Sequence, residues 1–215
     1  MTYTVTLSWY TVEYQYHYHH QKGQTYMQTN RSIVSPLRID SVAVPGTGGL
    51  IGMTICPGKD EYAGLGYTGG QWKRDLDLDL QVICGWRAEA LVTLIEDFEF
   101  ELLSVPELPG KVHAFGLRWL HLPIVDVWIP DQHFEEQWET AGAELRRILR
   151  DGGRIVLHCR GGLGRTGTIA GRLLVEFGME PREAIRRIRA ARSGTIQTRE
   201  QENYVRQCRS LAIVE

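Results

Sequence analysis

The chain has 215 residues, of which 43% are hydrophobic and 23% are charged, and its formal net charge is −2. This length suits one full-sized hydrophobic core, and the composition is that of an ordinary folded globular protein, which excludes wholesale disorder. The near-neutral charge gives no overall attraction to nucleic acid or to an anionic membrane, so we expect neither as a partner. Any anion must be recognised by a local arrangement of hydrogen-bond donors.

Four cysteines are spread widely along the chain, at Cys56, Cys84, Cys159 and Cys208. Without a C-x-x-C pair they fit neither a zinc site nor a dense disulfide framework, and we expect no metal and no other cofactor. The start of the sequence does not resemble a signal peptide, and no segment approaches the roughly 18 uninterrupted apolar residues of a membrane span. The sequence therefore predicts a cytoplasmic protein, in which thiols stay reduced.

Residues 1–35 differ from the rest because tyrosine, histidine, threonine and glutamine dominate and aliphatic residues are scarce. We interpret them as a polar, partly ordered leader, followed by a single domain over residues 36–215. As an alternative, His17, His19 and His20 offer ligands to a transition metal. Since no cysteine ligand lies nearby, we favour the leader.

Short apolar runs begin the domain. Ser41–Val44 and Leu50–Ile55 are separated by glycines and predict a hairpin or edge strands. The glycine-rich residues 64–70 lack the spacing of a nucleotide-binding loop that opens a helix, so we interpret them as turns.

The stretch Asp75–Leu80 alternates aspartate with leucine, which by period alone favours a strand. The run continues to Gly85, which can end a helix, and we predict a helix. Ala90–Ile95 is continuously apolar, as a buried parallel strand is. Helical segments are expected near residues 97–103 and 106–115, and a strand at Arg118–Leu122.

The second half of the chain alternates clearly between helix and strand. Residues 131–150 place six apolar side chains on one helical face, and residues 151–153 end that helix. A strand at Arg154–Leu157 and helices at Thr168–Phe177, from Pro181 and after Thr198 follow. This alternation predicts an α/β fold with a central, mostly parallel sheet flanked by helices.

A glycine-rich turn joins that strand to the next helix over residues 158–167, His-Cys-Arg-Gly-Gly-Leu-Gly-Arg-Thr-Gly. Backbone N–H groups converge at such a turn, and the helix amino terminus adds positive potential, so the turn can hold a tetrahedral anion. An NTPase loop would require lysine where Arg165 stands. The expected phosphate-binding residues are Arg160, Gly161, Gly162, Leu163, Gly164 and Arg165.

Cys159 stands first in this turn, where the N–H groups favour its thiolate form. Arg165 presents a two-pronged donor to phosphoryl oxygens, and the Thr166 hydroxyl can donate to the sulfur as it leaves. A buried structural cysteine is the alternative, but glycines, arginine and threonine in this order favour catalysis. We predict nucleophilic attack on phosphorus, a phosphocysteine intermediate and hydrolysis by water, with His158 bracing the turn from behind.

Such a reaction requires an acid that protonates the leaving oxygen. Asp126 and Asp131 both precede the helix at 131–150. Asp131 has a structural explanation as the N-cap of that helix, whereas Asp126 lies in an apolar, proline-bounded loop without such a role. We favour Asp126 and keep Asp131 as the alternative.

The chain resembles the protein-tyrosine-phosphatase superfamily, in its dual-specificity branch, and is most similar to kinase-associated phosphatases of the cyclin-dependent kinase inhibitor type and their bacterial relatives. The similar segments are Leu122–Asp126 with Asp131, His158–Arg165, and Gly194–Tyr204. The resemblance implies a cysteine-dependent phosphatase fold.

By the same resemblance Cys159 is the nucleophile, Arg165 the phosphate binder and Asp126 the general acid. It also implies that Gln197 positions the attacking water. Gln201 is expected to share that task, although residues 198–201 also form a capping-box pattern, which favours a structural role. Residues 127–129, Val-Trp-Ile, replace the smaller, glycine-bearing stretch typical after the acid, so motion of this loop should differ.

The predicted function is hydrolysis of phosphotyrosine in a protein or peptide, with phosphoserine and phosphothreonine left open. A phosphoinositide or RNA 5′-phosphatase would use the same turn. The phosphoinositide alternative is weak because Arg160 is the single charged residue between Cys159 and Arg165. A non-catalytic phosphoprotein-binding module is the other alternative, yet cysteine, arginine and acid are all present.

Overall fold

The structure is a computed structural model that describes Ser32 and residues 35–60 and 74–211 with their side chains. Before Ser32 it describes the backbone of two antiparallel hairpins. β1 (Thr2–Leu7) pairs with β2 (Tyr10–Gln15), and β3 (Tyr18–Gln21) pairs with β4 (Gln24–Met27). The metal-binding alternative for the histidine side chains and the turns expected at residues 64–70 lie outside the described residues.

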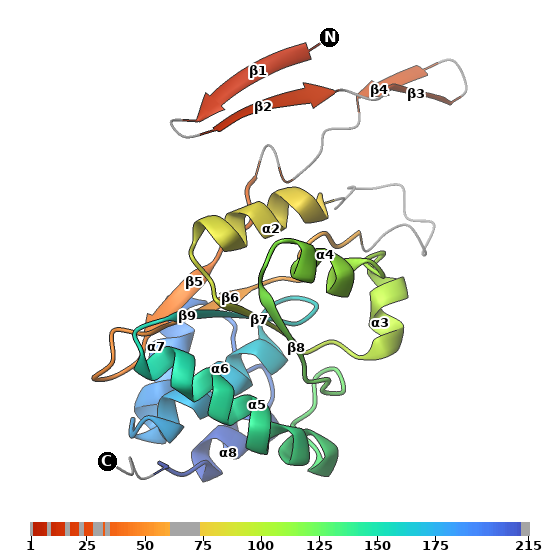
Figure 1. The fold of residues 1–215 in the computed structure, drawn as a ribbon. Helices are drawn as coiled ribbons and strands as arrows, with labels where there is room; N and C mark the ends of the chain where they lie inside the picture. Colours follow the sequence, from red (N-terminus) through yellow and green to blue (C-terminus); the bar gives the residue numbers. More distant parts are fainter. Residues whose placement is uncertain are drawn as a thin grey trace.

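A five-stranded sheet forms the centre of the domain, in the order β5-β6-β9-β7-β8 (Figure 1). β5 and β6 form an antiparallel hairpin, as predicted, and all other neighbours are parallel. The predicted α/β fold with a mostly parallel sheet is thus confirmed. The strands are β5 (Asp40–Ala43), β6 (Leu50–Thr54), β7 (Ala90–Thr93), β8 (Arg118–His121) and β9 (Arg154–His158).

Helices cover both faces of this sheet. In Figure 1, α5 to α8 lie on one side and α2 to α4 on the other. β7 and β9 in the middle are therefore buried on both faces, which explains their apolar runs, residues 90–92 and 155–157. The helices are α2 (Leu76–Gly85), α3 (Asp97–Leu102), α4 (Leu108–Ala114), α5 (Gln132–Arg150), α6 (Gly164–Glu176), α7 (Pro181–Ala191) and α8 (Arg199–Gln207).

The alternating aspartate–leucine segment is helical, as predicted. Asp75 caps α2, since its side chain accepts a hydrogen bond from the N–H of Leu78 at 3.0 Å. Leu76, Leu80 and Ile83 recur at helical spacing and are buried. The period of two is therefore a by-product of capping and of one buried charge, and it does not reflect a pleated strand.

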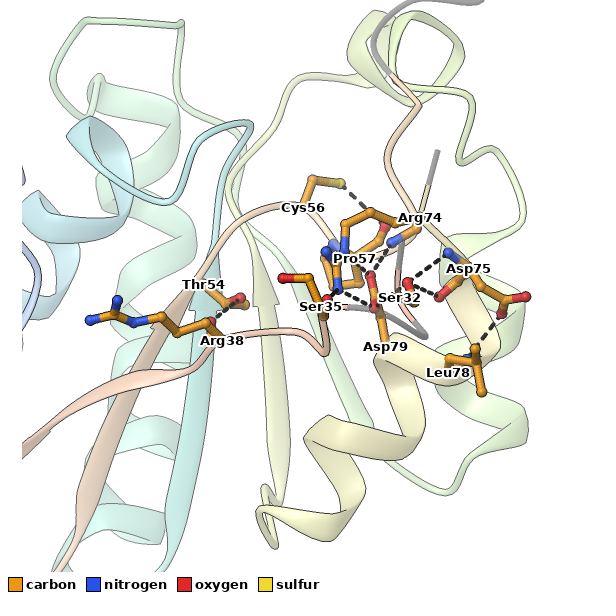
Figure 2. Close-up of polar contacts among 11 residues, drawn as sticks. Ser32, Ser35, Arg38, Thr54, Cys56, Pro57, Arg74, Asp75, Leu78 and Asp79 are labelled. Carbon is orange, nitrogen blue, oxygen red and sulfur yellow. Dashed lines mark hydrogen bonds and ion pairs between the residues drawn. The ribbon is translucent and has the colours of Figure 1, made fainter. Parts of the chain in front are cut away.

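That buried charge is Asp79, which is fully buried beside Arg74 (Figure 2). Its Oδ2 lies 2.7 Å from Arg74 Nε, and its Oδ1 lies 2.8 Å from Arg74 Nη2. Ser32 Oγ and the N–H of Gly58 also donate to the carboxylate, each at 2.9 Å. A buried ion pair is tolerated only when its remaining hydrogen bonds are made, as here. The cluster ties Ser32 and the loop after β6 to α2.

α6 begins at Gly164, four residues earlier than the sequence predicted. The helical backbone therefore starts inside the glycine-rich turn, and Arg165 and Thr166 lie in its first turn, where N–H groups have no partner within the helix. None of the helices within the described part of the chain has both the length and the apolar character needed to cross a membrane.

Candidate active site

Cys159 lies at the carboxyl end of β9, where residues 160–163 lead into α6. Its side chain is almost completely buried, with 3% exposed. Gly162 has φ of +67°, and a Cβ atom there would lie 2.2 Å from the Thr54 carbonyl oxygen, so no other residue fits. The N–H of Cys56 donates to the Arg160 carbonyl at 3.3 Å. The turn is thus pressed against the end of β6.

Arg192 holds the same turn from outside. Its Nε donates to the Gly162 carbonyl at 2.7 Å and its Nη2 to the Gly161 carbonyl at 3.1 Å. Asp40 on β5 fixes the guanidinium at 2.8 Å. Because a peptide N–H points opposite to its carbonyl, these bonds direct the following N–H groups away from Arg192, as an anion-binding nest requires.

Arg165 is 1% exposed and is bound on several sides. Arg165 donates hydrogen bonds to both carboxylate oxygens of Glu99 in α3, at 2.5 Å from Nη1 and 2.9 Å from Nη2. Burial disfavours the charge, but the hydrogen bond that Arg165 donates to the Glu99 carboxylate raises the pKa of Arg165, so the guanidinium stays charged. Nη1 also donates to the carbonyls of Leu94 and Ile124, at 3.3 and 3.1 Å.

Two donors at this turn are buried and lack a hydrogen-bond partner among the described residues, namely Arg165 Nε and Thr166 Oγ1. Leaving a buried donor unpaired costs about 1–3 kcal/mol, so such groups in a folded protein need an explanation. Both belong to the turn that carries Cys159, and both are hydrogen-bond donors that an oxyanion or a thiolate can accept from.

The two candidate acids have different partners. Asp126 Oδ1 lies 2.9 Å from Arg165 Nη2, and its side chain is 47% exposed. Asp131 caps α5, since its Oδ1 accepts from the N–H of Phe134 at 2.8 Å. The structure therefore places Asp126 beside Arg165 and gives Asp131 the capping role.

His158 is fully buried behind Cys159. Burial, together with the Arg165 cation, lowers the pKa of His158 to about 3, so the ring is neutral. Its Nε2 lies 2.8 Å from Thr93 Oγ1, which accepts from Trp119 Nε1 at 2.9 Å, and its Nδ1 lies 3.4 Å from the Cys159 carbonyl. With the ring proton on Nδ1, Trp119 donates to Thr93, Thr93 donates to His158 Nε2, and His158 Nδ1 donates to the Cys159 carbonyl. These hydrogen bonds link β8, β7 and the turn.

Acid should destabilise the fold through His158. Below pH 6.5 an unfolded chain protonates this ring, while the folded chain does not until about pH 3. The free energy of unfolding therefore falls as pH drops through this window, by about 1.4 kcal/mol per unit. We expect urea titrations of the wild type to lose about 2 kcal/mol more than His158→Gln between pH 6.5 and pH 5. Equal losses in the two proteins would contradict this assignment.

Gln197 and Gln201 both lie against the start of α6. A Cβ atom on Gly164 would meet Gln197 Oε1 at 2.7 Å and Gln201 Nε2 at 3.0 Å. Gln201 is fully buried and completes the capping box of α8, since its Oε1 accepts from the N–H groups of Gln197 and Thr198. Its Nε2 donates to the Trp128 carbonyl at 3.0 Å. The Gln197 side chain is the one of the two that has no such structural contacts among the described residues.

Two residues of the site were not predicted from the sequence, Glu99 and Arg192. Glu99 lies among other acidic residues of a short helix, and its partner Arg165 is 66 positions away. Arg192 follows a helix rich in exposed arginines, and its contacts with the turn are 30 and 31 positions away. Neither has a local sequence signal that separates it from its solvated neighbours.

Comparison with known proteins shows which proteins the chain is similar to. The cyclin-dependent kinase inhibitor 3 of Rattus norvegicus is 35% identical over 114 residues, which are 52% of each chain. That of Mus musculus is 30% identical over 139 residues, 64% of each chain. The chain thus spans between half and two thirds of the length of these two relatives.

A solved kinase-associated phosphatase, whose catalytic cysteine was replaced by serine, shares the fold with a TM-score of 0.68 at 24% identity. The match covers 83% of this chain and 93% of that one. Residues 78–205, more than half of the chain, match the family model described as Swiss Army Knife protein, DSP-PTPase phosphatase domain. The chain therefore belongs to the dual-specificity family of protein-tyrosine-phosphatase domains.

Proposed function

We propose that the protein hydrolyses phosphomonoesters of phosphorylated proteins or peptides through a phosphocysteine intermediate. The pair of buried, unpartnered donors on Arg165 and Thr166 beside Cys159 is the observation that carries this proposal. Arg165 Nε and the N–H groups of residues 160–164 would bind the phosphoryl oxygens. Preorganised donors of this kind stabilise the charge of a transferring phosphoryl group.

In the first step the Cys159 thiolate attacks phosphorus, the P–O bond to the substrate breaks, and Asp126 gives its proton to the leaving oxygen. In the second step water attacks the phosphocysteine and Asp126 takes up the water's proton. The P–S bond then breaks, and the thiolate returns as inorganic phosphate leaves. Gln197 positions the water, and the Thr166 hydroxyl donates a hydrogen bond to the departing sulfur.

The surroundings of Asp126 favour an aromatic phosphomonoester. Val125, Val127 and Trp128, which neighbour Asp126 in the sequence, are 53%, 55% and 55% exposed, and Phe98, which precedes Glu99 in the sequence, is 63% exposed. Exposed apolar side chains around a site are suited to contact an apolar substrate. We therefore propose phosphotyrosine in a protein as the preferred substrate. A reduced thiolate also requires a reducing compartment, so we propose a cytoplasmic location.

Hydrolysis of 4-nitrophenyl phosphate by the purified protein tests this function. We expect turnover that continues in excess EDTA and is inhibited by vanadate. A panel of phosphotyrosine, phosphoserine and phosphothreonine peptides then ranks the substrates, with phosphotyrosine expected first. Absence of turnover, or a requirement for added metal, would count against the proposed chemistry, and faster hydrolysis of a phosphoinositide or an RNA 5′-phosphate would favour the alternatives.

A further inference from the structure

We propose that Gln201 is a positioning residue that holds the acid loop, residues 122–130, in the conformation in which Asp126 reaches the reacting phosphate. This inference rests on the proposed function and assigns a task within it. It differs from the expectation that Gln201 positions water, because the side-chain amide of Gln201 donates a hydrogen bond to the backbone of the acid loop.

The acid loop is held at two points. On one side Arg165 donates to the Ile124 carbonyl at 3.1 Å and pairs with Asp126 at 2.9 Å. On the other side Gln201 Nε2 donates to the Trp128 carbonyl at 3.0 Å. Gln201 is itself immobilised, because it is fully buried and its Oε1 completes the capping box of α8. Both anchors are thus rigid parts of the domain.

Between the two anchors the backbone is strained. Val127 has φ of +56°, a region that a β-branched residue rarely adopts. The N–H of Trp128 donates to the Val125 carbonyl at 3.1 Å and closes a four-residue turn, in which φ above zero at the third position favours glycine. Such strain persists when the surroundings over-determine the conformation. Loss of one anchor should therefore let the turn relax and carry Asp126 away.

The variant Gln201→Glu removes this anchor selectively. A carboxylate keeps the acceptor that the capping box needs, but it cannot donate to the Trp128 carbonyl. Poor leaving groups depend on the acid more than good ones. We expect kcat/KM for phenyl phosphate to fall about tenfold more than kcat/KM for 4-nitrophenyl phosphate. A general repulsion of phosphate by the new charge cancels in this ratio.

Two further variants serve as controls. Thr198→Ala breaks the other half of the capping box and should lower the melting temperature without changing the ratio. Val127→Gly relieves the backbone strain, because glycine adopts positive φ without cost. Combined with Gln201→Glu, it should move the ratio of the two kcat/KM values part of the way back to that of the wild type. A ratio that Gln201→Glu leaves unchanged, or that Thr198→Ala changes equally, would overturn the proposal.

Hydrogen exchange gives a test that does not depend on activity. The Trp128 amide should exchange faster in Gln201→Glu than in the wild type, and should be unaffected in Thr198→Ala. Equal protection of the Trp128 amide in all three proteins would contradict the proposal that Gln201 holds the acid loop. If the wild type shows no hydrolysis that Cys159→Ser removes, the proposed function fails, while the exchange measurement still decides whether Gln201 holds the loop.

Discussion

Replacing Cys159 by serine is expected to abolish turnover of every phosphomonoester while phosphate still binds. A serine hydroxyl requires a general base to become a nucleophile. His158, the neighbouring imidazole, is buried behind the turn with Thr93 and the Cys159 carbonyl as its partners, so it is not available for this task. We expect a loss of kcat on the order of 10⁵-fold. Steady-state kinetics and calorimetric titration with inorganic phosphate measure the two quantities.

Cys208→Ser is the matched control for this substitution. Cys208 is half-buried at the end of α8, and its thiol donates to the Tyr204 carbonyl at 3.3 Å, a bond that a serine hydroxyl can also make. We expect near wild-type kcat in this variant. Full activity of Cys159→Ser, or loss of activity in Cys208→Ser alone, would remove Cys159 from the role of nucleophile.

Asp126→Asn should lower kcat/KM for a phosphotyrosine peptide by about 10³-fold, because the leaving phenolate then departs without a proton. The pH profile provides the sharper test. Since the acid must be protonated to act, the wild-type rate falls as pH rises through its titration. An asparagine does not titrate, so this alkaline fall should be absent in the variant.

Asp131→Asn separates the two candidate acids cleanly. Asparagine caps helices as well as aspartate does, so the bond from the N–H of Phe134 and the stability of α5 should be retained. We expect kcat/KM and the alkaline fall to remain as in the wild type. Loss of the alkaline fall in Asp131→Asn, with Asp126→Asn active, would assign the acid to Asp131.

Much of the fold was predictable from local patterns. The apolar runs in β7 and β9 and the six apolar residues on one face of α5 are local patterns. They predict their elements without any knowledge of tertiary contacts. The ambiguous case was the aspartate–leucine alternation. Asp79 is tolerated on the buried face of helix α2 because Arg74 pairs with it and because Ser32 and Gly58, 47 and 21 positions away, also donate to its carboxylate. The spacing of apolar residues along the sequence does not reveal such distant partners.

The order of residues in the turn from His158 to Gly167 already indicates an anion site with a reactive cysteine, because glycine spacing, the helix start and side-chain chemistry are all local. The tertiary structure alone decides which carboxylates reach Arg165. Glu99 and Asp126 lie 66 and 39 positions before it, and folding of the sheet brings both within 2.9 Å of its guanidinium. Gln201 meets the acid loop across 73 positions in the same way. Contacts so distant in sequence depend on how the sheet orders its strands, which no local pattern encodes.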